Sequence, residues 1–181
     1  MTLIDQALTW KAVEERLAVE TDAVVRRNLE VVLEHMRAEA ALDVDRLMAT
    51  VNDDPHYHFR NGPARGEFHG RDAVRAFYEG FAASGATKLQ VDTYRLVADR
   101  YCIITEGVQR IAFPAATLAM RGITVDDPSA DYLFEAWSVT IWPFDEDGKL
   151  IGEDAYYGGD GFRGIEQRKV RPWDVLMATS P

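Results

Sequence analysis

The sequence predicts a single α+β domain in which helices come first and antiparallel strands follow. Its 181 residues are enough to bury one core without disulfide bonds. Three amphipathic helical stretches lie within the first 84 residues, and runs of aromatic and β-branched residues recur after residue 88. Elements in this order pack as layers around one core. A curled sheet around the longest helix would enclose a pocket.

The periodicity of apolar residues predicts three helices. The first is a short amphipathic helix over residues 3–20, and the third spans residues 71–84. The second covers residues 29–51. Thr21-Asp22 offers its N-cap. Pro55 ends it, because proline disfavours the helical conformation in the residue before it. Its buried stripe is expected to include Leu33, Met36 and Leu47.

Strands are expected where side chains alternate or where aromatic and β-branched residues gather. A short strand over residues 56–60 would bury Tyr57 and Phe59. That strand would leave its two histidines on the opposite face. Longer strands are expected over residues 88–96, 101–111 and 132–142, with residues 112–131 as a long connection.

The dipeptide Asp147-Gly148 is a hairpin-turn signal between two strand-like runs. Because side chains alternate along a strand, the residues after this turn divide between two faces. One face is expected to carry Ile151, Glu153, Ala155 and Tyr157. The other is expected to carry Leu150, Gly152, Asp154 and Tyr156. Each face sets a carboxylate near a phenol, so a face that lines a cavity could support acid–base chemistry.

Composition excludes several classes of partner. The formal charge of −10 and the pI of about 4.8 give a surface that repels phosphate backbones, so no nucleic-acid partner is expected. No stretch has the length of a membrane span and no signal peptide is visible, so a cytoplasmic protein without membrane contact is expected. Cys102 is the only cysteine, and His56 and His58 lack a defined third ligand. No metal and no cofactor are therefore expected.

Three motifs carry a resemblance to a known superfamily. They are His69-Gly70-Arg71-Asp72-Ala73-Val74, Thr105-Glu106-Gly107-Val108, and Asp147-Gly148-Lys149-Leu150 leading to Tyr156-Tyr157. In this order they resemble the nuclear transport factor 2-like superfamily, in particular its SnoaL-like polyketide cyclases and limonene epoxide hydrolase. The resemblance implies a cystatin-like cone, with helices packed on a strongly curved, mostly antiparallel sheet that encloses a pocket. It also implies a homodimer formed through the outer sheet face.

The resemblance divides the chain into three parts. Residues 1–27 form an N-terminal helical extension, residues 28–165 the SnoaL-like domain, and residues 166–181 a C-terminal tail. The same resemblance excludes epoxide hydrolysis, because the aspartate–arginine–aspartate set of those enzymes falls on Gln109, Gly107 and Ala155. Ketosteroid isomerisation through a helix tyrosine is also excluded, since residues 29–51 contain no tyrosine.

The register implied by the resemblance turns the face of Glu153 and Tyr157 towards the cavity. Glu153 in an apolar pocket would have a raised pKa and could act as a general base. Tyr157 could donate a hydrogen bond to a developing enolate oxygen. The substrate-binding candidates are Tyr57, Phe59, Asn61, Phe77, Gln109 and Trp137. The prediction is a cofactor-independent cyclase- or isomerase-type enzyme that acts on a small hydrophobic carbonyl compound.

Two alternatives stay open at this point. Glu153 could be an exposed or ion-paired strand residue with Tyr157 in the core. The whole protein could also be a non-catalytic ligand-binding or assembly module of the same fold, as the small subunits of ring-hydroxylating dioxygenases are. A cavity-facing ionisable group with a perturbed pKa would favour the enzyme over the binding module.

Overall fold

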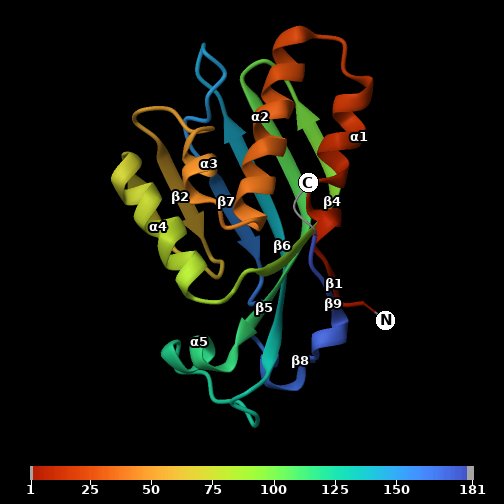
Figure 1. Ribbon diagram of the computed structural model, residues 1–181, viewed down its shortest axis with the longest axis vertical. Helices are drawn as coiled ribbons and strands as arrows, with labels where there is room; N and C mark the ends of the chain where they lie inside the picture. Colours follow the sequence, from red (N-terminus) through yellow and green to blue (C-terminus); the bar gives the residue numbers. More distant parts are fainter. Residues whose placement is uncertain (1, 179–181) are drawn as a thin grey trace.

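The structure is a computed structural model that describes residues 2–178, and Figure 1 shows how its elements are arranged. The helices are the 3₁₀ turn η1 (Gln6–Thr9), α1 (Lys11–Val19), α2 (Ala23–Ala40), α3 (Val44–Met48), α4 (Arg71–Ala83), α5 (Ala115–Met120), and the 3₁₀ turns η2 (Ile165–Gln167) and η3 (Pro172–Asp174). The strands are β1 (Ile4–Asp5), β2 (His56–Arg60), β3 (Gly66–His69), β4 (Lys88–Ala98), β5 (Cys102–Pro114), β6 (Asp131–Pro143), β7 (Asp154–Gly158), β8 (Lys169–Val170) and β9 (Val175–Leu176).

Most of these strands form one sheet, in the order β3-β2-β7-β6-β5-β4, with β8 added beside β6. Each pairing described within it is antiparallel except that of β2 with β7, which is parallel. In Figure 1 the helices α1 to α4 lie on one side of this sheet. The α+β architecture with a mostly antiparallel sheet is therefore confirmed.

A bulge bends the sheet where β4 meets β5. The register shifts between Thr93 and Arg95, which leaves Tyr94 without a partner across the ladder. Gly107 pairs with Thr93 at this point, and a Cβ atom there would overlap the backbone carbonyl of Asp92. A bulge adds twist and curvature to the strand that contains it. The close approach of the two backbones explains why residue 107 is a glycine.

The predicted helix over residues 29–51 is two helices. The first, α2, begins after Asp22, whose carboxylate accepts hydrogen bonds from the backbone N–H groups of its first turn. The chain then bends at Leu42, whose φ of 57° is left-handed, and Asp43 caps α3. The prediction of one continuous helix was wrong, because a residue with left-handed φ breaks the helical hydrogen-bond ladder. The burial of the expected stripe is confirmed, with Leu33, Met36 and Leu47 at 8%, 5% and 1% exposed.

The first predicted helix is also shorter than expected, since α1 begins only at Lys11. Residues before it form β1, which pairs in parallel with β9 near the other end of the chain. Ile4 is fully buried in this pairing, and Trp10 and Val13 pack against α2. Both ends of the described chain are thus packed onto the domain. Met1 and residues 179–181, which belong to the predicted extension and tail, lie outside the described residues.

The predicted final hairpin forms with a longer connection than expected. β6 ends at Pro143 and β7 starts only at Asp154. Between them, Leu150 bridges to both Phe144 and Val51 and is fully buried, whereas Ile151 is 37% exposed. The expected alternation therefore fails at residues 150 and 151. Strand β3 and helix α5 were not predicted. In residues 2–178 no helix combines the length and the apolarity needed to cross a bilayer.

Candidate functional site

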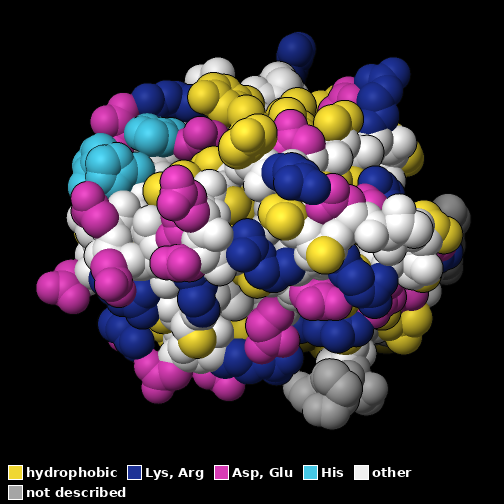
Figure 2. Space-filling model, turned by 90° about the horizontal axis from the view of Figure 1, so that it is seen from above, with side chains coloured by type: hydrophobic (Ala, Val, Ile, Leu, Met, Phe, Trp, Pro, Cys, Tyr) yellow, Lys and Arg dark blue, Asp and Glu magenta, His cyan; other side chains and the backbone are white. Residues whose placement is uncertain are grey.

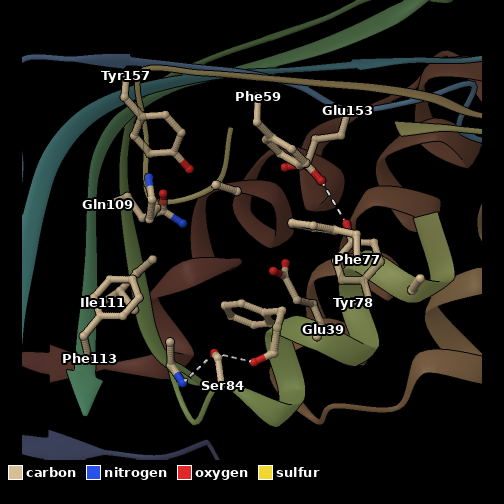
Figure 3. Close-up of a pocket in the computed structure, with 16 residues that line it drawn as sticks. Glu39, Phe59, Phe77, Tyr78, Ser84, Gln109, Ile111, Phe113, Glu153 and Tyr157 are labelled. Carbon is tan, nitrogen blue, oxygen red and sulfur yellow. Dashed lines mark hydrogen bonds between the residues drawn. The ribbon is translucent and has the colours of Figure 1, made fainter. Parts of the chain in front are cut away.

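A cavity of about 330 Å³ lies between the helices α2 and α4 and the strands β2, β5 and β7 (Figure 3). Its walls are mostly apolar, with Phe59, Phe77, Phe81 and Phe113 among the lining residues. Phe59 and Phe77 stack with ring centroids 4.9 Å apart. The polar side chains at the cavity are Glu39, Tyr78, Ser84, Gln109, Glu153 and Tyr157. An apolar cavity with a few polar groups is the usual form of a small-molecule site.

The backbone around Gly152 places Glu153 at this cavity. Gly152 lies so close to the carbonyl of His56 that a Cβ atom would overlap it. The N–H of His58 donates to the Glu153 carbonyl across 2.9 Å, which joins this segment to β2. Burial, with a smaller contribution from the charge of Glu39, raises the pKa of Glu153 to about 8. The partly buried side chain of Glu153 thus reaches the cavity (Figure 3).

A second carboxyl group, that of Glu39, enters the same cavity from the last turn of α2 (Figure 3). Burial raises its pKa to about 7. No described residue forms a hydrogen bond with this carboxyl group. Glu39 is not among the site residues predicted from the sequence. The signal was present as a second line along α2, with Asn28, Val32, His35 and Glu39 at steps of four, three and four residues.

A chain of hydrogen-bonding groups runs from Glu153 into the core. The Tyr78 hydroxyl lies 3.0 Å from Glu153 Oε2 and 3.1 Å from His35 Nε2. His35 Nδ1 lies 2.8 Å from Thr50 Oγ1, which donates to the Leu47 carbonyl across 2.6 Å. Burial lowers the pKa of His35 to about 3, so its ring is neutral near pH 7. Neither Tyr78 nor His35 is among the site residues predicted from the sequence.

Two further polar groups at the cavity are available to a ligand. The Tyr157 hydroxyl points into the cavity, and the Tyr157 ring packs on Gly62, where a Cβ atom would overlap it (Figure 3). Burial raises the pKa of Tyr157, so its hydroxyl stays protonated. Gln109 Oε1 is buried and has no hydrogen-bond partner among the described residues. Such orphaned buried atoms are costly, and a ligand donor would satisfy this one.

The structure brings five of the eight predicted site residues to the cavity: Phe59, Phe77, Gln109, Glu153 and Tyr157. The other three lie elsewhere. Tyr57 is fully buried behind the wall, Asn61 is exposed in a turn with a φ of 61°, and Trp137 is 52% exposed. Trp137 belongs to a surface hollow that it shares with Tyr156.

Asp154 faces away from the cavity and meets the histidines of the outer surface. Its carboxylate lies 2.5 Å from His58 Nδ1. His56, His58 and His69 gather on this face, where Figure 2 shows them beside acidic side chains. In the part of the chain that the structure describes, no three metal-binding side chains are arranged around a common point.

Comparison with known proteins identifies the family. A family model described as a SnoaL-like domain matches residues 32–152. This match covers about two thirds of the sequence, so the chain belongs to the SnoaL-like family. The sequence matches no curated protein.

Solved structures share the fold at low sequence identity. A putative SnoaL-like polyketide cyclase from Shewanella putrefaciens CN-32 superposes with a TM-score of 0.65 at 12% identity, covering 85% of this chain and 92% of its own. A second one, from Shewanella denitrificans OS-217, gives 0.62 at 14% identity, covering 77% and 96%. The protein TerC, co-crystallised with polyporic acid, gives 0.56 at 11% identity, covering 78% and 98%. The nuclear transport factor 2-like fold is thereby shown.

Proposed function

We propose that the protein is a cofactor-independent acid–base enzyme, of the isomerase or cyclase type, that acts on a small hydrophobic carbonyl compound. The observation that carries the proposal is the carboxyl group of Glu153 in an aromatic cavity. Burial raises its pKa to about 8, which brings its proton exchange near neutral pH. A general acid or base works best when its pKa lies near the working pH.

The polar groups have separate roles in this proposal. Glu153 exchanges a proton with the carbon next to the carbonyl group or with its oxygen. The Tyr157 hydroxyl donates a hydrogen bond to the oxygen as negative charge develops on it. The Gln109 amide has one unsatisfied oxygen that can accept a hydrogen bond from the substrate. Phe59 and Phe77 hold an apolar ring by contact, so the proposed substrate is uncharged and largely carbocyclic.

Three structural neighbours support a small-molecule role. Two of the structural neighbours are described as putative SnoaL-like polyketide cyclases, and a third was co-crystallised with polyporic acid. Epoxide hydrolysis by an aspartate–arginine–aspartate set is not proposed. The position aligned with the arginine is Gly107, where the backbone of β4 leaves no room for a side chain.

Deuterium exchange tests the proposal without knowledge of the natural substrate. The protein is incubated in D₂O with a panel of enolisable aromatic ketones that begins with 2-tetralone, and deuterium next to the carbonyl is followed by NMR. Wild-type protein should accelerate the exchange, and Glu153→Gln should abolish the acceleration. Glu79→Gln is the matched control, because its side chain is 59% exposed on α4 and outside the cavity. Ketone binding without accelerated exchange would instead favour the non-catalytic binding module.

We also propose that two copies pair through the outer face of the sheet. Tyr94 and Trp137 contact each other there, with ring centroids 5.4 Å apart, and are 60% and 52% exposed. Tyr156 is 45% exposed at the same hollow. Exposed aromatic groups of this kind mark interaction surfaces. Light scattering after size-exclusion chromatography should give twice the mass of 20.4 kDa, and a monomer at micromolar concentration would contradict the dimer.

A further inference from the structure

We propose that Glu39 and Glu153 act as a proton-transfer pair, in which Glu153 holds a proton at rest and Glu39 accepts the proton from the substrate. This inference rests on the proposed acid–base function and deepens it. It adds Glu39 as a catalytic residue and assigns opposite roles to the two carboxyl groups. The assignment follows from counting hydrogens along the chain of groups behind Glu153.

Thr50 has one hydroxyl hydrogen, which can be donated to one acceptor only. Its Oγ1 lies 2.6 Å from the Leu47 carbonyl oxygen. Two oxygens at this distance repel each other unless a hydrogen lies between them, so Thr50 donates to Leu47. His35 Nδ1 lies 2.8 Å from the same hydroxyl. Because the Thr50 hydrogen is already used, His35 Nδ1 must be the donor in this contact.

The single ring hydrogen of His35 determines the direction of the hydrogen bonds between His35 and Glu153. A neutral histidine carries one ring hydrogen, so His35 Nε2 is an acceptor and receives the hydrogen of the Tyr78 hydroxyl across 3.1 Å. Tyr78 then has no hydrogen left for Glu153 Oε2, which is 3.0 Å away. This contact is satisfied when Glu153 is protonated and donates to the Tyr78 oxygen. If Tyr78 donated to an ionised Glu153, His35 would need two protons, and burial opposes that charge.

Glu39 has different surroundings. Its carboxyl group points into the cavity and forms no hydrogen bond with the described residues. Like-charged groups in one cavity disfavour a second ionisation, so the pair tends to keep one proton. The last turn of α2 also disfavours a negative charge on Glu39, which brings the two titrations close together. The hydrogen-bond chain decides between them, because only Glu153 has a partner that requires its proton.

Several titratable groups surround the pair. These groups are Glu39 and His35 from α2, Tyr78 from α4, Tyr57 from β2, and Asp154 and Tyr157 from β7. No lysine or arginine lines the cavity among the described residues. A single negative charge on Glu39 therefore has no cationic partner there, which keeps it basic enough to remove a proton from carbon.

A pair with one proton suits a 1,3-proton shift in an enolisable ketone that has a β,γ double bond. The Glu39 carboxylate takes a proton from the carbon next to the carbonyl. The C–H electron pair forms a carbon–carbon double bond, the carbonyl π pair moves to oxygen, and Glu153 gives its proton to that oxygen. The intermediate is then a dienol. Glu39 delivers its proton to the γ carbon, the double bond moves between the α and β carbons, and the oxygen returns its proton to Glu153 as the carbonyl re-forms. Atoms and charges balance, the pair ends as it began, and the product is an isomer of the substrate.

Carboxyl ¹³C NMR on ligand-free protein tests the resting state. Glutamate is labelled at Cδ, and the two signals are assigned by their loss in Glu39→Gln and Glu153→Gln. At pH 7.5 we expect the Glu153 signal in the acid form and the Glu39 signal closer to the carboxylate form. ¹⁵N NMR should place the His35 proton on Nδ1. A carboxylate signal for Glu153 beside an acid signal for Glu39 would overturn the assignment, as would a proton on His35 Nε2.

Deuterium exchange with the ketone panel tests the role of Glu39. We expect Glu39→Gln to lose about a hundredfold in exchange rate, the size typical of a missing general base. The wild-type profile should be bell-shaped, because only the pair with one proton is active. Exchange by Glu39→Gln at the wild-type rate would overturn the role of Glu39 while leaving the proposed function intact. No exchange by wild-type protein with any ketone would contradict the proposed function itself. The NMR experiment uses ligand-free protein, so its result does not depend on whether a ketone reacts.

Discussion

Replacing Glu153 with glutamine should make the protein more stable at pH 7 and less sensitive to pH. The carboxyl group has a pKa of about 8 in the folded protein and 4.5 as its ordinary value. The folded state therefore binds its proton more tightly than the unfolded state does. The stability associated with this proton is fully present below pH 4.5 and is lost as pH rises towards 8. Glutamine is neutral throughout and keeps a similar shape.

The expected size follows from the linkage relation. Each proton that folding retains contributes a slope of about 1.4 kcal/mol per pH unit to the free energy of unfolding. Between pH 4.5 and 7 the cost of Glu153 therefore grows to about 3 kcal/mol, an upper figure because Glu39 titrates together with it. The Glu153→Gln variant should exceed wild type by about 2–3 kcal/mol at pH 7 and by at most about 1 kcal/mol at pH 5.

Urea unfolding at pH 5, 6, 7 and 8 measures this difference for wild type and both variants. Glu79→Gln is again the control, and as an exposed substitution it should stay within about 0.5 kcal/mol of wild type at each pH. Carboxylates with lowered pKa values, such as Asp22 and Asp174, change the free energy of unfolding only below this pH range. Their contributions are the same in wild type and variant, so they cancel in the difference. Equal pH slopes for wild type and Glu153→Gln would refute the reasoning, because Glu153 would then titrate alike in the folded and unfolded states.

Three further outcomes are expected. Tyr78→Phe should lower the free energy of unfolding by about 1–3 kcal/mol, because it leaves the buried Nε2 of His35 unpaired, and chemical denaturation measures it. Gly107→Ala should destabilise by more than about 3 kcal/mol or prevent folding, because its Cβ atom would overlap β4. Its matched control, Gly80→Ala, has open space on α4 and should be neutral or stabilise by up to about 1 kcal/mol, and thermal unfolding of both variants measures the difference. Trp137→Lys should shift the proposed dimer towards monomer in light scattering, and an unchanged mass would speak against the outer sheet face.

Local patterns determined much of this protein. The order of helices and strands follows from apolar periodicity, and so do the strand of Tyr57 and Phe59 and the buried stripe of α2. The two-residue period after the Asp147-Gly148 turn also sets Glu153 and Tyr157 on one face of the last strand. These features depend on neighbours within a few residues, so the sequence alone contains them. The break of the long helix at Leu42 also has a local cause, and Asp43, which caps α3, is a sequence signal beside it.

Only the tertiary structure decided which faces meet. Leu150 is buried and Ile151 exposed because Val51 and Phe144 bridge to Leu150, an inversion that strand alternation does not foresee. Glu39 lies on a helix face that is polar in sequence, and it becomes part of the cavity because α4 and β7 close over it. A pKa depends on the water that packing removes. That water is removed by segments more than a hundred residues apart, such as α2 and β7, so the paired carboxyl groups exist only in the folded chain.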